Sequence, residues 1–203
     1  MFKRKSLKSP LKGPFKTPLK IFPTLLIFII FFTDQLSKWW VMEQWYKADQ
    51  ATPGFFSWLT QTGDRFVHPP IKITEFFNMV MVWNEGISFG IFSSGGAIMV
   101  WMLSFLAIGI ATIFFVWMHR TTSGMLRAAL ALVIGGALGN VADRLRYGAV
   151  ADFFDFHLLD YHWPAFNIAD SVIVIGMILF IWDTFFLNPA GETEQKHLMD
   201  KVV

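Results

Sequence analysis

The sequence predicts an all-α membrane protein with four transmembrane helices, and three observations support that fold class. Of its 203 residues, 54% are hydrophobic and 16% are charged, whereas a soluble domain carries about 25% charged residues. Four apolar stretches are long enough to cross the roughly 30 Å hydrocarbon core. Most of the ionisable residues near these four stretches lie at their ends. A single compact membrane domain explains this pattern better than soluble domains do.

Residues 1–20 form a basic tail ahead of the first apolar stretch. Seven Lys and Arg alternate with Pro10, Pro14 and Pro18, and no acidic residue interrupts them. Prolines at this spacing prevent a stable helix. The positive-inside rule predicts a cytoplasmic tail, which anionic lipid headgroups would attract. Aromatic residues hardly occur among these charges, so nucleic-acid binding is not expected.

The first transmembrane helix is predicted over residues 21–41. No signal-peptide cleavage site follows it, so we expect it to be retained. Asp34 and Lys38 lie four residues apart and share one helical face. They are either an exposed ion pair at a helix end or a pair in which Asp34 points inward to brace a site.

Residues 43–95 form a long outer segment of mixed polarity. Pro53-Gly54 and Pro69-Pro70 interrupt it, and Ile71–Thr74 and Asn78–Val82 have the β-branched content of short strands. Asn84, Glu85 and Gly86 then mark a loop. The remaining transmembrane helices are predicted over residues 97–117, 125–142 and 165–187, with a tight turn at Thr121–Gly124 after the second one. Asp183 is expected at the membrane interface, and residues 188–203 form a polar cytoplasmic tail.

Topology predicts that the polar motifs meet at one membrane face. The basic tail and the short loop with Arg120 and Arg127 belong inside, so both chain termini are cytoplasmic. The polar residues at the helix edges then all lie at the outer face. They are Asp34, Asn84, Asn140, Asp143, Arg144, Asp152, Asn167 and Asp170.

Asp152 and Asp170 are the candidates for chemistry. Two carboxylates in a low-dielectric pocket do not both ionise easily, so one can act as a base toward water while the other acts as an acid. That arrangement suits hydrolysis of an amide without a covalent intermediate. The sequence contains neither a His-Glu-x-x-His zinc motif nor a Gly-x-Ser-x-Gly elbow, and it contains no cysteine. His157 and His162 fit no standard zinc spacing and are predicted to be loop histidines, so no metal or cofactor is expected.

Five short motifs resemble those of the lipoprotein signal peptidases (signal peptidase II), which are bacterial inner-membrane aspartyl proteases. They are Asp34-Gln35-x-x-Lys38, Asn84-x-Gly86-x-x-Phe89, Gly139-Asn140-x-x-Asp143-Arg144, Val150-x-Asp152-Phe153 and Phe166-Asn167-x-Ala169-Asp170. Each is weak alone, but five in order among four apolar helices are specific. The resemblance covers residues 31–182, with Ala151 replacing a common valine.

The resemblance implies a catalytic pair, Asp152 and Asp170, in a protease domain of residues 21–187. Asn84, Asn140, Arg144 and Asn167 would orient that pair and hold the substrate backbone. Asp34, Lys38, Gly86, Asp143 and Ala169 would support or contact the site, with Asp143 paired to an arginine. Residues 43–95 would form a small extracytoplasmic β platform with a short helix.

The implied substrates are diacylglyceryl-modified prolipoproteins, cleaved just before the lipidated cysteine. The implied protein is a monomer in the inner membrane, in contact with lipids and inhibited by the cyclic peptide globomycin. Two other classes remain open from the residues alone. A proton- or ion-coupled transporter would need polar residues throughout the membrane depth, and a metal-dependent phospholipid synthase would need repeated Asp-x-x-Asp spacing on the cytoplasmic face.

Overall fold

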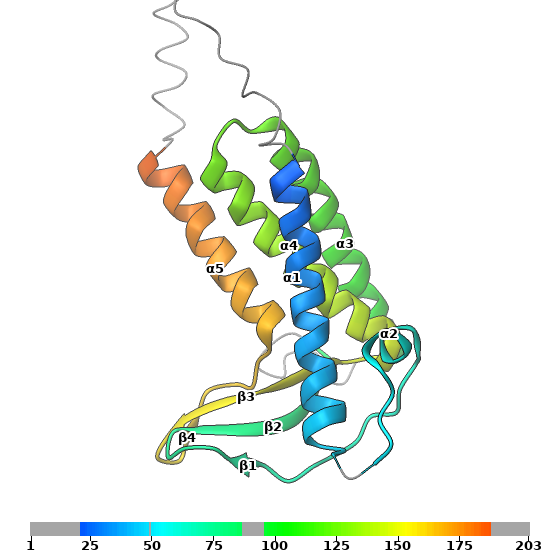
Figure 1. Ribbon diagram of the computed structural model, residues 1–203. Coiled ribbons are helices and arrows are strands. Elements are labelled where there is room, and N and C mark those ends of the chain that lie inside the picture. The colour runs from blue at the N-terminus through cyan, green and yellow to red at the C-terminus, as the bar shows by residue number, and fades with distance from the viewer. Residues whose placement is uncertain (1–20, 49, 87–95, 188–203) are drawn as a thin grey trace, which may run out of the picture.

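The structure is a computed structural model that describes residues 21–48, 50–86 and 96–187. The expected basic tail (1–20), the polar tail (188–203) and the end of the outer segment (87–95, with Phe89) lie outside the described residues. Four long helices run side by side, and a small sheet lies across one end of them (Figure 1). All four helices have the length and hydropathy needed to cross a membrane. The described residues therefore confirm the predicted fold class.

The four long helices are α1, α3, α4 and α5. α1 spans Ile21–Trp39 and continues as a π-helical segment, Trp40–Trp45. α3 spans Gly96–Arg120, and α4 spans Gly124–Tyr147. α5 spans Ile168–Trp182 and ends in a second π-helical segment, Asp183–Leu187. The short helix α2, Phe55–Thr60, lies beside the sheet end of the bundle.

Local capping sets the ends of α4 and α5. Ser123 accepts a hydrogen bond from the Leu126 N–H and begins α4, while Gly148, with φ of 67°, ends it in the left-handed conformation that glycine favours. α4 is five residues longer at its carboxyl end than predicted, because its last polar side chains find partners inside the protein. α5 begins three residues later than predicted, because Asn167 has an extended backbone and forms a capping box with Asp170.

α4 is the central helix, packed against α1, α3 and α5. Two of its glycines allow this close approach, as small residues do in membrane bundles. A Cβ at Gly136 would lie 2.6 Å from the Ala169 carbonyl oxygen, and a Cβ at Gly139 would lie 2.4 Å from Asp34 Oδ2. Close packing at Gly136 and Gly139 therefore brings the start of α5 and the polar end of α1 against the same face of α4.

The sheet has four antiparallel strands in the order β1-β2-β3-β4. β1 is Ile71–Lys72, β2 is Phe77–Asn84, β3 is Val150–Leu158 and β4 is Tyr161–His162. Strands were predicted near β1 and β2, within the platform expected from residues 43–95. The structure adds to this sheet the two strands β3 and β4, which come from the link after α4. β3 pairs with β2 from Val150 to Phe156, with a register shift between Met79 and Val82, and this pairing opposes Asp152 to Val82.

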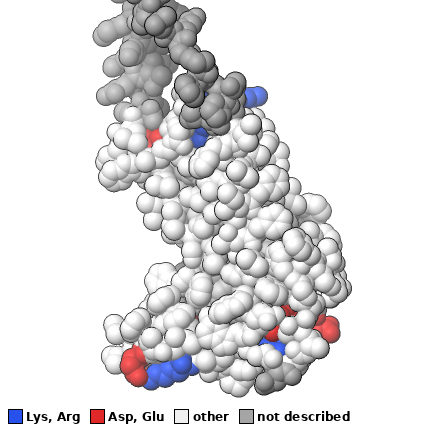
Figure 2. All heavy atoms as spheres, in the orientation of Figure 1, with Lys and Arg blue, Asp and Glu red and all other residues white. Residues whose placement is uncertain are grey.

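The surface of the helical part is apolar. Large side chains on α3 and α5, such as Phe105 (67% exposed) and Ile178 (58% exposed), face outward. In the view of Figure 2 the middle of the molecule is white, and the charged side chains gather toward its two ends. This is the distribution expected where lipid surrounds the helices.

Candidate active site

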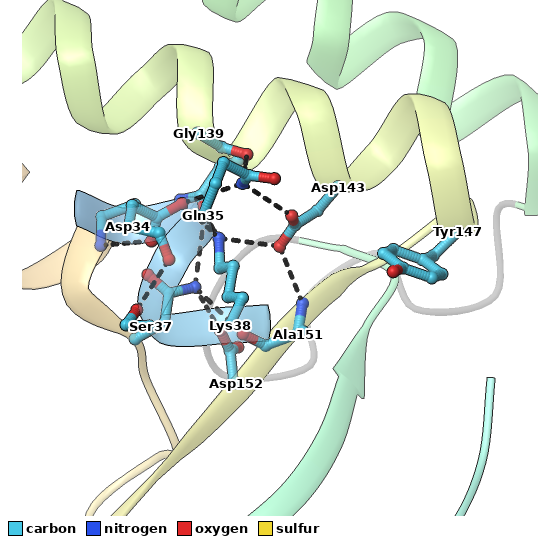
Figure 3. A network of polar contacts seen from close by, with 12 residues as sticks. Asp34, Gln35, Ser37, Lys38, Gly139, Asp143, Tyr147, Ala151 and Asp152 are labelled. Carbon is cyan, nitrogen blue, oxygen red and sulfur yellow. Dashed lines mark hydrogen bonds and ion pairs between the residues drawn. The ribbon is translucent and has the colours of Figure 1, made fainter. Parts of the chain in front are cut away.

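A buried lysine lies at the centre of a polar network at the sheet end of the bundle (Figure 3). Lys38 Nζ lies 2.8 Å from Asp34 Oδ2 and 2.7 Å from Asp143 Oδ2, and all three side chains are fully buried. The structure therefore supports the inward orientation of Asp34 over an exposed ion pair. Asp143 was expected to pair with an arginine. That expectation is wrong, because Lys38 on α1 faces Asp143 across the helix contact.

The two carboxylates of this network also hold the backbone of two other segments. Asp34 Oδ1 accepts a hydrogen bond from the Ala169 N–H at 3.0 Å. Asp143 Oδ2 accepts one from the Ala151 N–H at 3.2 Å. Ala169 precedes Asp170 in the chain, and Ala151 precedes Asp152. Lys38 thus fixes, through one carboxylate on each side, the residue before each of the two candidate aspartates.

Asp152 lies in β3 and is 1% exposed. Its two oxygens accept hydrogen bonds from two amide side chains, Asn84 Nδ2 at 3.0 Å and Asn167 Nδ2 at 2.8 Å. Asn84 comes from the end of β2, which the sheet register brings beside β3. Asn167 comes from the cap of α5. The carboxylate is therefore positioned by residues far apart in the sequence.

Asp170 lies in the first turn of α5 and is half-buried. Asn140 on α4 donates from Nδ2 to Asp170 Oδ1 at 2.8 Å, and the Asn167 N–H lies 3.2 Å from Asp170 Oδ2. Asn167 Nδ2, which contacts Asp152, also lies 3.2 Å from Asn140 Oδ1. The two asparagines thus link the two aspartates side by side.

The two aspartates have different electrostatic surroundings. Burial raises the pKa of Asp152 to about 8, and the nearby charge of Asp170 acts in the same direction. The amide hydrogen bonds from Asn84 and Asn167 lower that pKa, but they do not offset the desolvation. Asp170, by contrast, is only half-buried, in the first turn of α5. At neutral pH a proton therefore resides mainly on Asp152.

An apolar cavity of about 390 Å³ opens beside Asp170. Trp163, Phe166, Val174 and Ile175 are among its lining residues. Asp170 is thus reachable from a space with apolar walls, whereas Asp152 is buried in the sheet and does not line that space. Such an arrangement can bring an apolar ligand and a water molecule to the carboxylate pair.

Arg144 lies near the aspartates without a hydrogen bond to either of them in the described part of the chain. It donates from Nη2 to the Gly86 carbonyl oxygen at 3.2 Å. Its Nε is buried and has no partner among the described residues. The structure therefore brings together all the predicted site residues, with Arg144 and Gly86 at the edge of the cluster.

Gln35 belongs to the network but was assigned no role from the sequence. Its Nε2 lies 3.0 Å from Asp143 Oδ1 and 3.2 Å from the Gly139 carbonyl oxygen. Its Oε1 lies 3.3 Å from Arg146 Nη1. The available signal was a second polar residue beside Asp34 in an apolar helix. Its role depends on which helix it faces, and the sequence does not give that.

Three other predictions concern residues away from this cluster. Asp183 was expected at the membrane interface; it lies at the end of α5, and its side chain is buried (1% exposed) and accepts a hydrogen bond from Ser123 Oγ at 2.5 Å. His157 and His162 were expected in a loop, but they lie on β3 and β4 with stacked rings. Within the described residues no group of three His, Asp or Glu side chains could hold a metal ion.

Comparisons with known proteins identify the family of this chain. Residues 26–186 match the family model described as Signal peptidase (SPase) II. A lipoprotein signal peptidase of Shewanella baltica (strain OS155) is 40% identical over 168 residues, covering 82% of this chain and 86% of the relative. One from Ralstonia nicotianae (strain GMI1000) is 50% identical over 113 residues, or 55% of this chain and 65% of the relative.

Two solved structures share the fold. Both are bacterial membrane enzymes solved by the in meso method, at 2.3 Å and 1.9 Å resolution. The first has a TM-score of 0.63 at 23% identity and covers 84% of this chain and 90% of its own. The second has a TM-score of 0.58 at 24% identity, and the match covers 83% of this chain and 94% of the solved chain. Together with the family match, these likenesses show that the chain belongs to the signal peptidase II family of multi-pass membrane proteases.

Proposed function

We propose that this protein is an aspartic endopeptidase that removes signal peptides from prolipoproteins carrying a diacylglyceryl-modified cysteine. Cleavage falls just before that cysteine, by water activated between Asp152 and Asp170. The observation that carries this proposal is the pairing of the two aspartates. One comes from β3 and the other from α5, and Asn140 and Asn167 link them.

The surroundings of each aspartate assign its role. Asp170 is half-exposed and lies beside the cavity, so it takes a proton from the attacking water. Asp152 holds a proton at neutral pH because its pKa is raised to about 8. It donates a hydrogen bond to the scissile carbonyl and then protonates the leaving amine. The water oxygen adds to the carbonyl carbon, and the C–N bond breaks as the proton arrives.

The apolar cavity supports a lipid-modified substrate. Its walls at Trp163, Phe166 and Val174 suit hydrocarbon, and it opens beside Asp170. Arg144, with its unpartnered Nε, can donate to a substrate carbonyl oxygen, since guanidinium is always a donor. We expect globomycin to inhibit the enzyme by occupying the same space.

The transporter alternative finds no support in the long helix α3. Its two hydroxyl side chains in the membrane depth both bond to their own helix. Ser104 Oγ donates to the Val100 carbonyl oxygen at 2.7 Å, and Thr112 Oγ1 donates to that of Ile108 at 2.8 Å. Ser104 is buried and Thr112 is exposed on the surface of the helix, so the two hydroxyls do not line a common polar path through the membrane depth.

Substitution of each aspartate tests the proposal. We expect Asp152→Asn and Asp170→Asn each to lower kcat on a purified diacylglyceryl-modified precursor by about 10²–10⁴-fold, the usual contribution of an acid or a base. Asp155→Asn is the matched control, because Asp155 is also buried in β3 but bonds to Asn78 and His162. Its kcat should stay within a few-fold of the wild type.

The same assay defines the substrate and the chemistry. The unlipidated precursor should remain uncut, and chelators should leave the rate unchanged. Full turnover by either aspartate variant, with its thermal unfolding unchanged in detergent, would exclude the pair as the reacting groups. Equal cleavage of both precursors would exclude the lipidated cysteine as the recognised group.

A further inference from the structure

The outer half of β3 has two unlike faces. Residues on one face alternate with those on the other along a strand. From Asp152 outward, one face carries Phe154, Phe156 and Leu158, and the other carries Asp155 and His157. The apolar face turns toward the link before α5, because the Phe156 and Phe166 rings stack with centroids 5.9 Å apart. A row of apolar side chains thus leads from Asp152 to the end of the sheet.

The polar face is internally bonded and turned toward charged groups. Asp155 accepts a hydrogen bond from Asn78 at 3.0 Å and lies 2.9 Å from His162 Nδ1. The adjoining β1–β2 connection carries Lys72 and Glu75, whose side chains are 61% and 88% exposed. The polar side chains of this face are therefore satisfied within the sheet, with Asp155 only 6% exposed, and the exposed charges beside it are those of Lys72 and Glu75.

The apolar face is uncovered toward its outer end. Exposure rises from Phe156 (44%) to Leu158 (75%) and Leu159 (86%). Tyr161 and Trp163 on the return path are also more than half exposed. We call these five residues the apolar lip. Isolated apolar residues on a surface are ordinary, but a contiguous apolar patch with Trp and Tyr indicates an interaction surface.

Leu159 adds a second observation at the turn between β3 and β4. Its φ is 55°, and it is the one non-glycine residue with positive φ in the described part of the chain. Glycine or asparagine would adopt this conformation at lower cost. A strained and exposed leucine is retained most readily where its side chain contacts something apolar.

The position of the lip points to lipid as its partner. The hairpin of β3 and β4 projects sideways past α5 at the end of the bundle, rather than away from the helices (Figure 1). Its apolar face continues onto the exposed side chains Val174 and Ile175 of α5 through the walls of the cavity. Those side chains belong to a helix that spans the membrane. The lip is therefore continuous with a surface that lipid already covers.

We propose that the apolar lip inserts into the boundary between headgroups and acyl chains of the bilayer that the helices cross. Trp and Tyr favour this depth. Asp152 lies six residues from Leu158, or about 20 Å along the strand. The inserted lip therefore acts as an anchor in addition to the helices, and it fixes the tilt of the sheet and the depth of the carboxylate pair. This placement does not rest on the proposed function.

Site-directed spin labelling tests the placement in the full-length protein. The chain has no cysteine, so each introduced cysteine is a unique labelling site. A nitroxide is attached to Leu159→Cys or Tyr161→Cys in vesicles of phosphatidylethanolamine and phosphatidylglycerol. Glu75→Cys is the reference exposed to water, and Phe105→Cys, in the middle of α3, is the reference exposed to lipid. Collision rates with oxygen and with a water-soluble nickel chelate give the depth of each label.

Insertion predicts that both lip labels collide with oxygen more often, and with the nickel chelate less often, than the label at residue 75. Their depths should lie between the two references. Nickel collision rates equal to those at residue 75 would overturn the proposal. Shielding from both reagents would also overturn it, because protein rather than lipid would then cover the lip. Unchanged thermal unfolding in detergent shows that each variant is folded.

Discussion

At the scale of single residues, two identical side chains acquire different chemistry from their surroundings. Asp152 lies in a strand with its carboxyl buried, and Asp170 lies half-exposed at a helix N-terminus. Burial is the larger influence on Asp152, and the charge of Asp170 adds to it. The pair is therefore unequal before substrate binds, which an acid and base mechanism requires.

The pH dependence of kcat/KM should report this inequality. Protonated Asp152 is the active form, so its fraction and the rate should fall as pH rises through about 8. Asn84→Ala removes an amide donor that stabilises the ionised form of Asp152. The pKa of Asp152 should then rise further, and the alkaline limb should move to higher pH. A limb that moves to lower pH in this variant would contradict the assignment of Asp152 as the acid.

At the scale of secondary-structure elements, Lys38 joins four of them. It comes from α1, its partner Asp143 comes from α4, and the two carboxylates hold backbone N–H groups of β3 and α5. Asn140 also lies within 3.4 Å of Lys38 Nζ. The network therefore holds the backbone next to both aspartates, although Lys38 forms no hydrogen bond or ion pair with either of them in the described part of the chain.

Lys38→Met should weaken both the fold and the chemistry. The variant leaves two buried carboxylates without a cation, a change that costs about 3–5 kcal/mol when one partner of a buried pair is removed. We expect a lower unfolding temperature in detergent and a lower kcat with little change in KM, because substrate contacts remain. Lys72→Met is the matched control, since the Lys72–Glu75 pair is exposed to solvent and contributes little to stability.

These measurements distinguish a role of Lys38 in positioning the two aspartates from a role in stability alone. If the Lys38→Met variant were merely unstable, its kcat per folded molecule at low temperature would equal that of the wild type. A reduced kcat in the folded fraction identifies Lys38 as a positioning residue. An effect no larger than that of Lys72→Met would mean that the network does not set the spacing of the aspartates.

At the scale of the whole molecule, the sheet and the α3–α4 loop mark opposite ends. Arg120 ends α3, and Arg127 lies in the first turn of α4. The guanidinium of Arg127 donates a hydrogen bond to the Thr121 carbonyl oxygen. The sheet lies at the other end of the helices (Figure 1). By the positive-inside rule the loop should face the cytoplasm and the sheet should face outward.

Labelling of single cysteines in intact cells should reveal this orientation. A membrane-impermeant maleimide should react with Glu75→Cys in the sheet but with Thr122→Cys in the loop only after the cells are lysed. Both positions are exposed in the structure, so burial does not account for a missing reaction. Reaction of the residue 122 variant in intact cells would reverse the topology and place the candidate site on the cytoplasmic side.

The sequence predicted which residues belong to the site but not which side chain each of them contacts. The sequence indicated that Asp34, Asn140, Asp143 and Asn167 would gather at one end of the bundle. It did not indicate that Asp143 faces Lys38 rather than an arginine, because that depends on the rotation of α4 against α1. The direction in which a side chain points around the helix axis changes by about 100° for each residue along the helix. A small error in the predicted rotation of α4 therefore assigns Asp143 to the wrong partner.

The sequence by itself determined the four membrane helices and the polar end of the bundle, because hydropathy over about 20 residues and charges at helix ends are local quantities. Tertiary structure alone decided that residues 150–158 form a strand beside β2, that Asp183 is buried and that Lys38 connects the backbones next to both aspartates. These features depend on contacts between segments up to 135 residues apart. The free energy of such contacts depends on distances that only the packed chain defines.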